Sequence, residues 1–296
     1  MGYSRHRDSL RGMDGSTVVI TGGNAGVGKE TAVGLARAGA NVVITSRDRA
    51  RGVAALTEVR ERSGSDAVEL MSLDLASFAS TRAFSEELLD RHDRLDVLVN
   101  NAGRVSRSRT ETQDGFETTF GVNHLGHFLL TSLLLDRLRA SAPSRVVVVA
   151  SHVHKQARRG LDFNDLQSEQ KYAPMAAYAR SKLANIYFAR ELARRLEGSG
   201  VTANSLHPGF VASRFGRDGD GGRLGDIVMP IARPLAISPE KGARTSIWLA
   251  SAPSLAGVTG EYFYKCKPST PTAVARDDEA ARRLWAVSEE LVATAL

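Results

Sequence analysis

The segment from Val18 to Gly28 constrains the fold of this chain more than any other stretch. A short apolar run at 18–20 ends in a glycine-rich turn, Thr21-Gly22-Gly23-Asn24-Ala25-Gly26-Val27-Gly28, and an amphipathic helical pattern follows at once. A turn between a strand and a helix brings backbone N–H groups and the helix N-terminus up to a phosphate. Glycine is needed where a Cβ would block the phosphate or the contact between helix and strand.

The spacing of these glycines narrows the kind of site. Gly22, Gly26 and Gly28 give G-x-x-x-G-x-G, which is not the G-x-G-x-x-G dinucleotide fingerprint and lacks the Lys-Ser/Thr of a P-loop. A glycine-rich turn alone could be purely structural. Its place directly after the first strand favours a dinucleotide site.

Short apolar runs alternate with longer helical patterns along the chain. The apolar runs predict strands at 17–21, 41–45, 67–73, 97–100, 146–150, 201–206 and 260–264. The helical patterns predict helices at about 26–38, 49–62, 77–91, 114–139, 175–197 and 239–250. This alternation predicts an α/β fold, with one Rossmann-type, doubly wound parallel sheet of about seven strands and helices on both faces.

No repeat or linker interrupts this pattern, so we expect a single NAD(P)-binding Rossmann domain over residues 1–296. Residues 1–15 are expected to be a flexible N-terminus. The last stretch, 277–296, is expected to be a helix that docks on the domain through one apolar face.

Composition bounds the compartment and the partners. The single cysteine, Cys266, excludes an intrachain disulfide and a thiolate metal cluster, and we expect no metal. No apolar run reaches the ~18–20 residues of a membrane span, and the charged N-terminus has no secretory signal. We therefore expect a cytoplasmic protein without a membrane span. The net charge of +6 could indicate nucleic acid, but the basic residues are dispersed. A solvated basic surface that favours a phosphorylated cofactor is expected instead, with no nucleic-acid partner.

The tip of the second strand bears on the choice of cofactor. A carboxylate at this position hydrogen-bonds the adenosine ribose and selects NAD. Here the tip carries Ser46 and Arg47. A guanidinium pairs with a 2′-phosphate that a carboxylate would repel, and Ser46 could add a hydroxyl donor. This predicts NADP(H) in preference to NAD(H). Alternatively Arg47 only covers the adenine ring, and Asp48 next to it could weaken the preference.

Three residues suggest the chemistry. Ser151 follows the buried run 146–150, and Tyr178 and Lys182 share one helix face at i, i+4 spacing. Reducing a carbonyl needs a hydride at carbon and a proton at oxygen. A free tyrosine has a pKa of about 10, and we expect Lys182 and the positive nicotinamide to lower it. Tyr178 would be the acid in reduction and the base in oxidation, while Ser151 would orient the substrate oxygen.

Taken together, these motifs resemble the short-chain dehydrogenase/reductase family. The resemblance is carried by the Thr-Gly-x-x-x-Gly-x-Gly turn, Asn100-Asn101-Ala102-Gly103, Tyr178-x-x-x-Lys182 and Pro208-Gly209. The long interval between Ser151 and Tyr178, the stretch 161–166 and His207-Pro208-Gly209 are similar to the retinol dehydrogenase-like and protochlorophyllide reductase-like branch.

The resemblance implies roles for further residues. It places Asn123 in a helix irregularity, where it would hold a water of the proton relay; a surface position or a local hydrogen bond is the alternative. Asp74 would contact the adenine, or would only form a helix N-terminal turn. The implied cofactor-binding residues are Gly22, Asn24, Gly26, Val27, Gly28, Ser46, Arg47, Asp74, Leu75, Asn101, Ala102, Gly103, Tyr178, Lys182, Pro208, Gly209, Val211 and Ser213.

The remaining features concern the substrate. The segment 212–236 is rich in glycine and charge and then turns apolar, which predicts a lid over a hydrophobic substrate; a plain surface loop is the alternative. His152 and His154 are interpreted as loop residues near the cleft. We expect an NADP(H)-dependent oxidoreductase acting on a hydrophobic ketone, aldehyde or alcohol.

Two other functions are alternatives to this one. The first is a catalytically silent NADP(H)-binding regulator on the same fold. The second, a sugar-nucleotide epimerase or dehydratase, needs a larger C-terminal domain than this chain has room for. The family resemblance suggests a homodimer or homotetramer, although a docked C-terminal helix could cover the usual interface.

Overall fold

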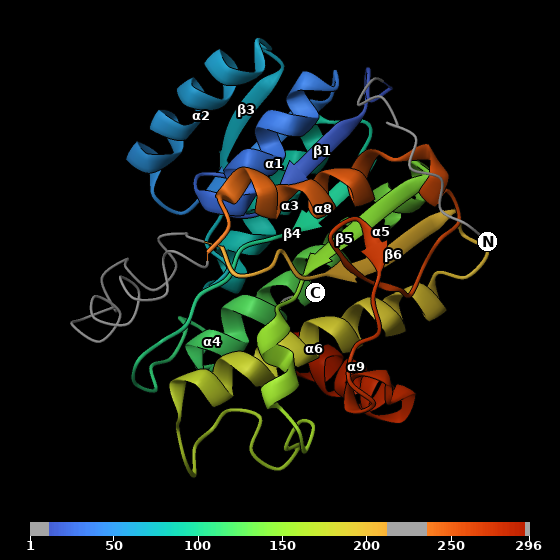
Figure 1. The fold of residues 1–296 in the computed structure, drawn as a ribbon. Helices are drawn as coiled ribbons and strands as arrows, with labels where there is room; N and C mark the ends of the chain where they lie inside the picture. The colour runs from blue at the N-terminus through green and yellow to red at the C-terminus, as the bar shows by residue number, and fades with distance from the viewer. Residues whose placement is uncertain (1–11, 212–235, 294–296) are drawn as a thin grey trace.

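A computed structural model describes residues 12–211 and 236–293, and its elements form one mostly parallel sheet between two layers of helices (Figure 1). The strand order is β3-β2-β1-β4-β5-β6-β7-β8, and all neighbours are parallel except β7 and β8. The strands are β1 (Thr17–Ile20), β2 (Asn41–Ser46), β3 (Val68–Ser72), β4 (Val97–Asn100), β5 (Ser144–Val149), β6 (Val201–Leu206), β7 (Tyr262–Tyr264) and β8 (Lys267–Pro268). Because the order reverses between β1 and β4, a crevice for ligands is expected at the carboxyl ends of these strands.

Helices cover both faces of this sheet. The main helices are α1 (Gly26–Arg37), α2 (Arg49–Ser63), α3 (Phe78–Arg91), α4 (Thr118–Phe120), α5 (Gly126–Ala140), α6 (Pro174–Arg195), α8 (Pro239–Ser251) and α9 (Asp278–Val292). A π-helical segment, η1 (Gly121–Leu125), joins α4 to α5. Short 3₁₀ turns lie at η2 (His152–Gln156), η4 (Pro253–Leu255) and η5 (Val274–Arg276).

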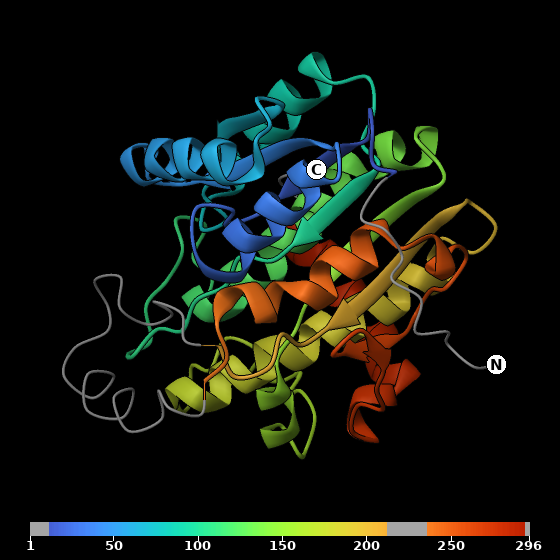
Figure 2. The same ribbon diagram turned by 45° about the horizontal axis from the view of Figure 1, so that its top comes forward.

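The core consists of two apolar clusters, one on each face of the sheet. Side chains of a strand alternate between the faces, so Val19 joins one cluster and Val18 and Ile20 join the other. The first cluster packs against α3, α5, α6 and α9, and the second packs against α1, α2 and α8. In Figure 2, α8 (orange) runs beside α1 (blue) over one face, and α9 (red) lies against α6.

The C-terminal helix docks as the sequence indicated. Trp285 stacks on Phe188 of α6 at a centroid distance of 5.8 Å and meets Phe128 of α5 edge-on at 4.8 Å. Ser288 lies 2.8 Å from Nε2 of His124 in η1. The side chains of Trp285 and Ser288 are buried, so α9 is part of the core.

The predicted fold class is confirmed, with three corrections. Among the described residues the sheet has eight strands, and about seven were expected. The additional strand, β8, consists of two exposed residues and is too short and too polar to stand out in the sequence. The helix expected at 114–139 begins at Thr118, where Glu117 caps it, and the π segment interrupts it. Residues 13–15 were included in the flexible N-terminus, but Met13 is buried and its N–H bonds the carbonyl of Ala38.

Two further expectations concern the ends of the described ranges and a membrane span. Most of the predicted lid, with Ser213, and residues 1–11 lie outside the described ranges. Within those ranges, no helix combines the length and the apolar character that crossing a membrane would require.

Candidate active site

The predicted site residues and the motifs that contain them lie where several strands end at one edge of the sheet. Thr21 follows β1, Asn101 follows β4, Ser151 lies just beyond β5, and His207 follows β6. Parallel strands bring these positions together, although the residues are far apart in the sequence. The glycine-rich turn connects the first of these strand ends to α1.

The start of α1 has the properties of a phosphate site. Its N-cap residue, Ala25, provides no capping hydrogen bond, and its first turn contains no acidic residue. By contrast, a side chain caps each of α2, α3, α8 and α9, whereas α6 also starts at an uncapped residue, Ala173. The first N–H groups of a helix have no partner within the helix, so those of α1 suit a pyrophosphate.

Close packing explains why glycine occupies this turn. A Cβ at Gly28 would lie 2.5 Å from the carbonyl oxygen of Gly22, and Gly26 has a φ of +53°. The Asn101 side chain braces the turn by donating to the carbonyl of Thr21 at 2.8 Å. A Cβ at Gly22 would lie 3.1 Å from that of Ala102. The two predicted cofactor motifs are therefore in direct contact.

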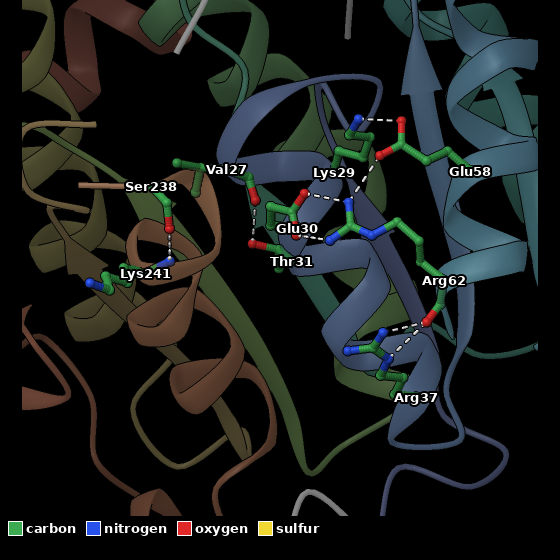
Figure 3. A network of polar contacts seen from close by, with 9 residues as sticks. All are labelled: Val27, Lys29, Glu30, Thr31, Arg37, Glu58, Arg62, Ser238 and Lys241. Carbon is green, nitrogen blue, oxygen red and sulfur yellow. Dashed lines mark hydrogen bonds and ion pairs between the residues drawn. The ribbon is translucent and has the colours of Figure 1, made fainter. Parts of the chain in front are cut away.

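A charged network supports this turn from the side of α2 (Figure 3). Lys29 on α1 pairs with Glu58 on α2 at 2.5 Å, and Arg62 on α2 holds the buried carboxylate of Glu30 through bonds of 2.6 and 2.7 Å. Arg37 donates to the carbonyl of Arg62. These contacts fix α1 relative to α2, the helix that starts beside the predicted 2′-phosphate residues.

The tip of β2 differs in detail from the sequence interpretation. The Ser46 hydroxyl donates to the carbonyl of Asp48 at 2.8 Å, so its proton is already used. The Asp48 carboxylate accepts from the N–H of Arg51 at 3.0 Å and caps α2. Arg47 is exposed at this tip.

Asn123 is buried in the middle of the π segment, so the helix irregularity is present. Its amide makes three hydrogen bonds: it accepts from the N–H of Arg104 at 2.8 Å and donates to the carbonyl of Arg104 and the hydroxyl of Ser181 at 2.9 Å. These bonds hold η1 between the segment after β4 and helix α6. The surface alternative for Asn123 is therefore wrong.

Lys182 points from α6 toward the same place. Its Nζ is buried and donates to the carbonyl of Val149 at 3.0 Å. A Cβ at Gly103 would lie 3.2 Å from that Nζ and 3.4 Å from Oδ1 of Asn123. Three segments thus converge on one point, and glycine is the residue that fits there. Burial lowers the pKa of Lys182 to about 8.

Tyr178 and Ser151 form a pair at this point. The Tyr178 hydroxyl is hydrogen-bonded to Ser151, and the Nζ of Lys182 lies 5.8 Å from the Tyr178 ring centroid. Burial raises the pKa of Tyr178 to about 12, and the bond to Ser151 acts in the opposite direction. The expected lowering by Lys182 is not found in the protein alone: burial raises the pKa of Tyr178, and the opposing contribution comes from the bond to Ser151. The lowering of this pKa that we expect from the positively charged nicotinamide concerns the protein with its cofactor bound, and it stays a prediction.

The other implied cofactor residues line the same edge. Asp74 accepts from the N–H of Ala76 at 3.0 Å, which matches its alternative reading as a turn residue. Leu75 is buried against η1 and α5, where a Cβ at Gly126 would meet its carbonyl oxygen at 2.6 Å. Val211 pairs with Ile237 and packs near Val27.

Residues 207–211, which directly follow β6, lie at this edge. Pro208 precedes Gly209, which has a φ of +92°. A Cβ at Gly209 would lie 3.1 Å from Ile237. Asn24 lies in the glycine-rich turn itself.

Several residues near the site escaped the sequence analysis. His154 was interpreted as a plain loop residue, but it is fully buried and its Nδ1 lies 2.7 Å from the carbonyl of Ser151. His127 is buried and contacts both Thr21 and Asn123. The sequence signal that could have identified His127 is its position, one helical turn after Asn123 in an otherwise apolar helix. No three His, Cys, Asp or Glu side chains in the described parts of the chain are arranged to hold a metal ion.

Comparison with known proteins decides the family. A family model described as short chain dehydrogenase matches residues 16–163. Retinol dehydrogenase 14 of Mus musculus is 48% identical, over 95% of this chain and 86% of that protein. Retinol dehydrogenase 13 of Homo sapiens is 46% identical, over 94% of this chain and 85% of the relative's chain. The chain belongs to the short-chain dehydrogenase family.

Within this family, the chain is retinol dehydrogenase-like, as its motifs indicated. A solved structure of an uncharacterised protein from Mycobacterium paratuberculosis has a TM-score of 0.76 at 35% identity and covers 96% of both chains. A Beutenbergia cavernae protein assigned as an NAD(P)-dependent gluconate 5-dehydrogenase, solved with NADP at low occupancy, has a TM-score of 0.68 at 26% identity. It covers 86% of this chain and 96% of that one. As a member of this family, the protein is an oxidoreductase that binds a nicotinamide cofactor.

Proposed function

We propose that this protein is an NADP(H)-dependent oxidoreductase that transfers a hydride between nicotinamide and a hydrophobic ketone, aldehyde or the corresponding alcohol. One observation carries the proposal: the Tyr178–Ser151 pair, Lys182 and Asn123 meet at the same sheet edge as the uncapped start of α1. A dinucleotide with its phosphates on α1 would extend along this edge toward Tyr178. The bound cofactor supplies the hydride.

The chain's own residues manage the proton. In reduction, the Tyr178 hydroxyl donates to the substrate oxygen, and Ser151 donates a second hydrogen bond that orients it. Lys182 is directed by its bond to Val149 and is placed to hold the hydroxyls of the nicotinamide ribose. A phenol with a pKa of about 12 stays protonated at neutral pH, which is the form that reduction requires.

The preference for NADP(H) rests on the tip of β2. The Asp48 carboxylate caps α2 and is engaged with Arg51. It is therefore a poor ligand for ribose hydroxyls, so we do not expect it to weaken the preference for NADP(H). Ser46 has no free proton to offer, so Arg47 is the residue we assign to the 2′-phosphate.

The substrate class is supported by exposed apolar side chains that are close in the sequence to predicted site residues. Among the described residues, Met175 and Phe210 are two of three large apolar side chains that are exposed. Met175 lies one helical turn before Tyr178, and Phe210 follows Pro208-Gly209. The names of the relatives agree with a hydrophobic alcohol or aldehyde. The predicted cytoplasmic location and oligomeric state stay predictions.

The decisive experiment measures NADPH consumption by the purified protein with retinal and a panel of bulky ketones. Tyr178→Phe is expected to abolish turnover with little change in NADPH affinity. Tyr187→Phe is the matched control, because Tyr187 lies on the same helix but bonds the carbonyl of Val274. Retained turnover in Tyr178→Phe would refute the assigned role. Tight NADPH binding without turnover on any carbonyl would favour the silent regulator.

A further inference from the structure

His127 occupies a buried position between three motifs that are separate in the sequence. It lies in the first turn of α5 and only 2% of its surface is exposed. Its Nδ1 is 3.1 Å from the carbonyl oxygen of Asn123, and its Nε2 is 2.8 Å from Oγ1 of Thr21. Oγ1 of Thr21 also accepts from the N–H groups of Asn101 and Ala102, at 2.8 and 2.9 Å.

The direction of every bond in this chain can be worked out. A carbonyl oxygen can only accept, so Nδ1 of His127 carries a proton and donates to Asn123. The Thr21 hydroxyl already accepts two hydrogen bonds, which uses both of its lone pairs. Its single proton is therefore donated to Nε2 of His127.

The alternative, in which the Thr21 hydroxyl donates its proton elsewhere, is excluded by the number of lone pairs and protons available. The carbonyl of Val99 lies 3.3 Å from Oγ1 of Thr21 and could take its proton. Nε2 of His127 would then have to donate to a hydroxyl with no lone pair left, and the imidazole would carry two protons. Burial lowers the pKa of His127 to about 3, so the ring is neutral at physiological pH.

We infer that His127 is a positioning residue, which as the Nδ1–H tautomer couples the glycine-rich turn and Asn101-Ala102 to the π segment that carries Asn123. The inference rests on the proposed function only where it concerns turnover. Through Nε2 the ring orients the hydroxyl that braces the cofactor turn. Through Nδ1 it holds the main chain beside Lys182 and Ser181.

A second line of contacts fixes the backbone of His127. The Thr131 hydroxyl donates to the His127 carbonyl at 2.7 Å and accepts from the side-chain amide of Asn100 at 2.9 Å. The end of β4 therefore determines where the imidazole stands. The ring is held at both its main chain and its nitrogens, so it transmits a displacement of one motif to the other.

Two substitutions separate the two bonds. An asparagine side chain ends at the distance of Nδ1 from the backbone and a glutamine side chain at that of Nε2. His127→Asn can keep the bond to Asn123 and loses Thr21, so the Kd of NADPH should rise about tenfold while kcat changes little. His127→Gln can keep Thr21 and releases Asn123, so kcat should fall about tenfold while NADPH affinity is kept.

The control is Ser288→Ala, which removes a buried hydrogen bond from the neighbouring His124 and leaves the His127 contacts intact. It should lower the thermal midpoint without changing kcat or the Kd of NADPH by more than about twofold. A purely structural role for His127 predicts the same behaviour for both of its variants. The inference would be overturned if the folded fractions of His127→Asn and His127→Gln showed the same changes in kcat and in the Kd of NADPH.

Nitrogen-15 spectra of the histidine rings test the inference without any turnover. The wild-type protein should show one ring, absent from the spectrum of a His127 variant, that is protonated at Nδ1 and not at Nε2 from pH 6 to 8. Protonation at Nε2 instead would refute the assigned bond directions. This measurement and the NADPH titration stand even if no carbonyl substrate is turned over.

Discussion

Replacing Arg47 with aspartate tests the cofactor preference most directly. Arg47 is exposed at the tip of β2, so its contact with a 2′-phosphate would form in a high dielectric. Hydrogen bonds to a charged group contribute about 1.5–3 kcal/mol, and a like-charge contact at ~4 Å in water adds about 1 kcal/mol of repulsion. The sum of about 2.5–4 kcal/mol predicts that Arg47→Asp weakens NADPH binding roughly 10²–10³-fold.

NADH is the reference cofactor for this variant because it lacks the 2′-phosphate. Its affinity should hold or improve in Arg47→Asp, since a carboxylate at a strand tip can bond ribose hydroxyls. Fluorescence titrations with both cofactors at low and high salt give the four affinities, and salt should reduce the effect because the site is exposed. Arg139→Asp makes the same change in net charge on the last turn of α5, at the opposite edge of the sheet. Equal losses for NADPH and NADH in Arg47→Asp would refute the reasoning.

Three further predictions concern Tyr178, the Arg62–Glu30 pair and two buried histidines. Tyr178 must be a phenolate to act as a base, so the rate of alcohol oxidation should rise with pH and that of carbonyl reduction should fall at high pH; parallel profiles for the two directions would contradict this. Arg62→Met leaves the buried Glu30 carboxylate without its two bonds and should cost about 2 kcal/mol in urea unfolding, less than a fully buried pair because Arg62 is one-third exposed. Burial lowers the pKa of His124 and of His127 to about 3, so below pH ~6.5 the unfolded state binds more protons and stability falls. Urea unfolding should show a loss of about 5 kcal/mol from these two groups between pH 7 and 4.5, and about half of that loss should disappear in His124→Asn.

The sequence predicted the central strands and the helices between them well. The run 146–150 is apolar at every position, which is expected only of a strand covered on both faces, and Val146 and Val147 indeed lie in different clusters. The bounds of the helix expected at 114–139 were less accurate. Its start depends on a single cap at Glu117, and the π segment depends on the bonds of Asn123 to Arg104 and Ser181. Such long-range bonds leave no periodic pattern in the sequence.

In the candidate site, too, features that depend on local spacing were predicted, and features that depend on long-range contacts were not. The spacing of Tyr178 and Lys182 follows from one helix, and the glycines of the turn follow from local geometry, so both were readable from the residues. The pKa of Tyr178 depends on how deeply α6 buries it against Ser151, and the direction expected from a nearby lysine was wrong for the protein alone. Ser46 and Asp48 likewise looked available, but each is engaged by its own neighbours.

Local rules of the chain therefore predict the fold class, the glycine-rich turn and the side chains that we propose to react. Strand periodicity, helix spacing and the needs of glycine act over a few residues, and these can be followed in the sequence alone. The tertiary structure decides which of these groups are free, charged or coupled. The buried chain from Asn101 through Thr21 and His127 to Asn123 joins residues up to 106 positions apart. Only folding brings their hydrogen-bonding atoms within reach and removes the water that would otherwise satisfy them.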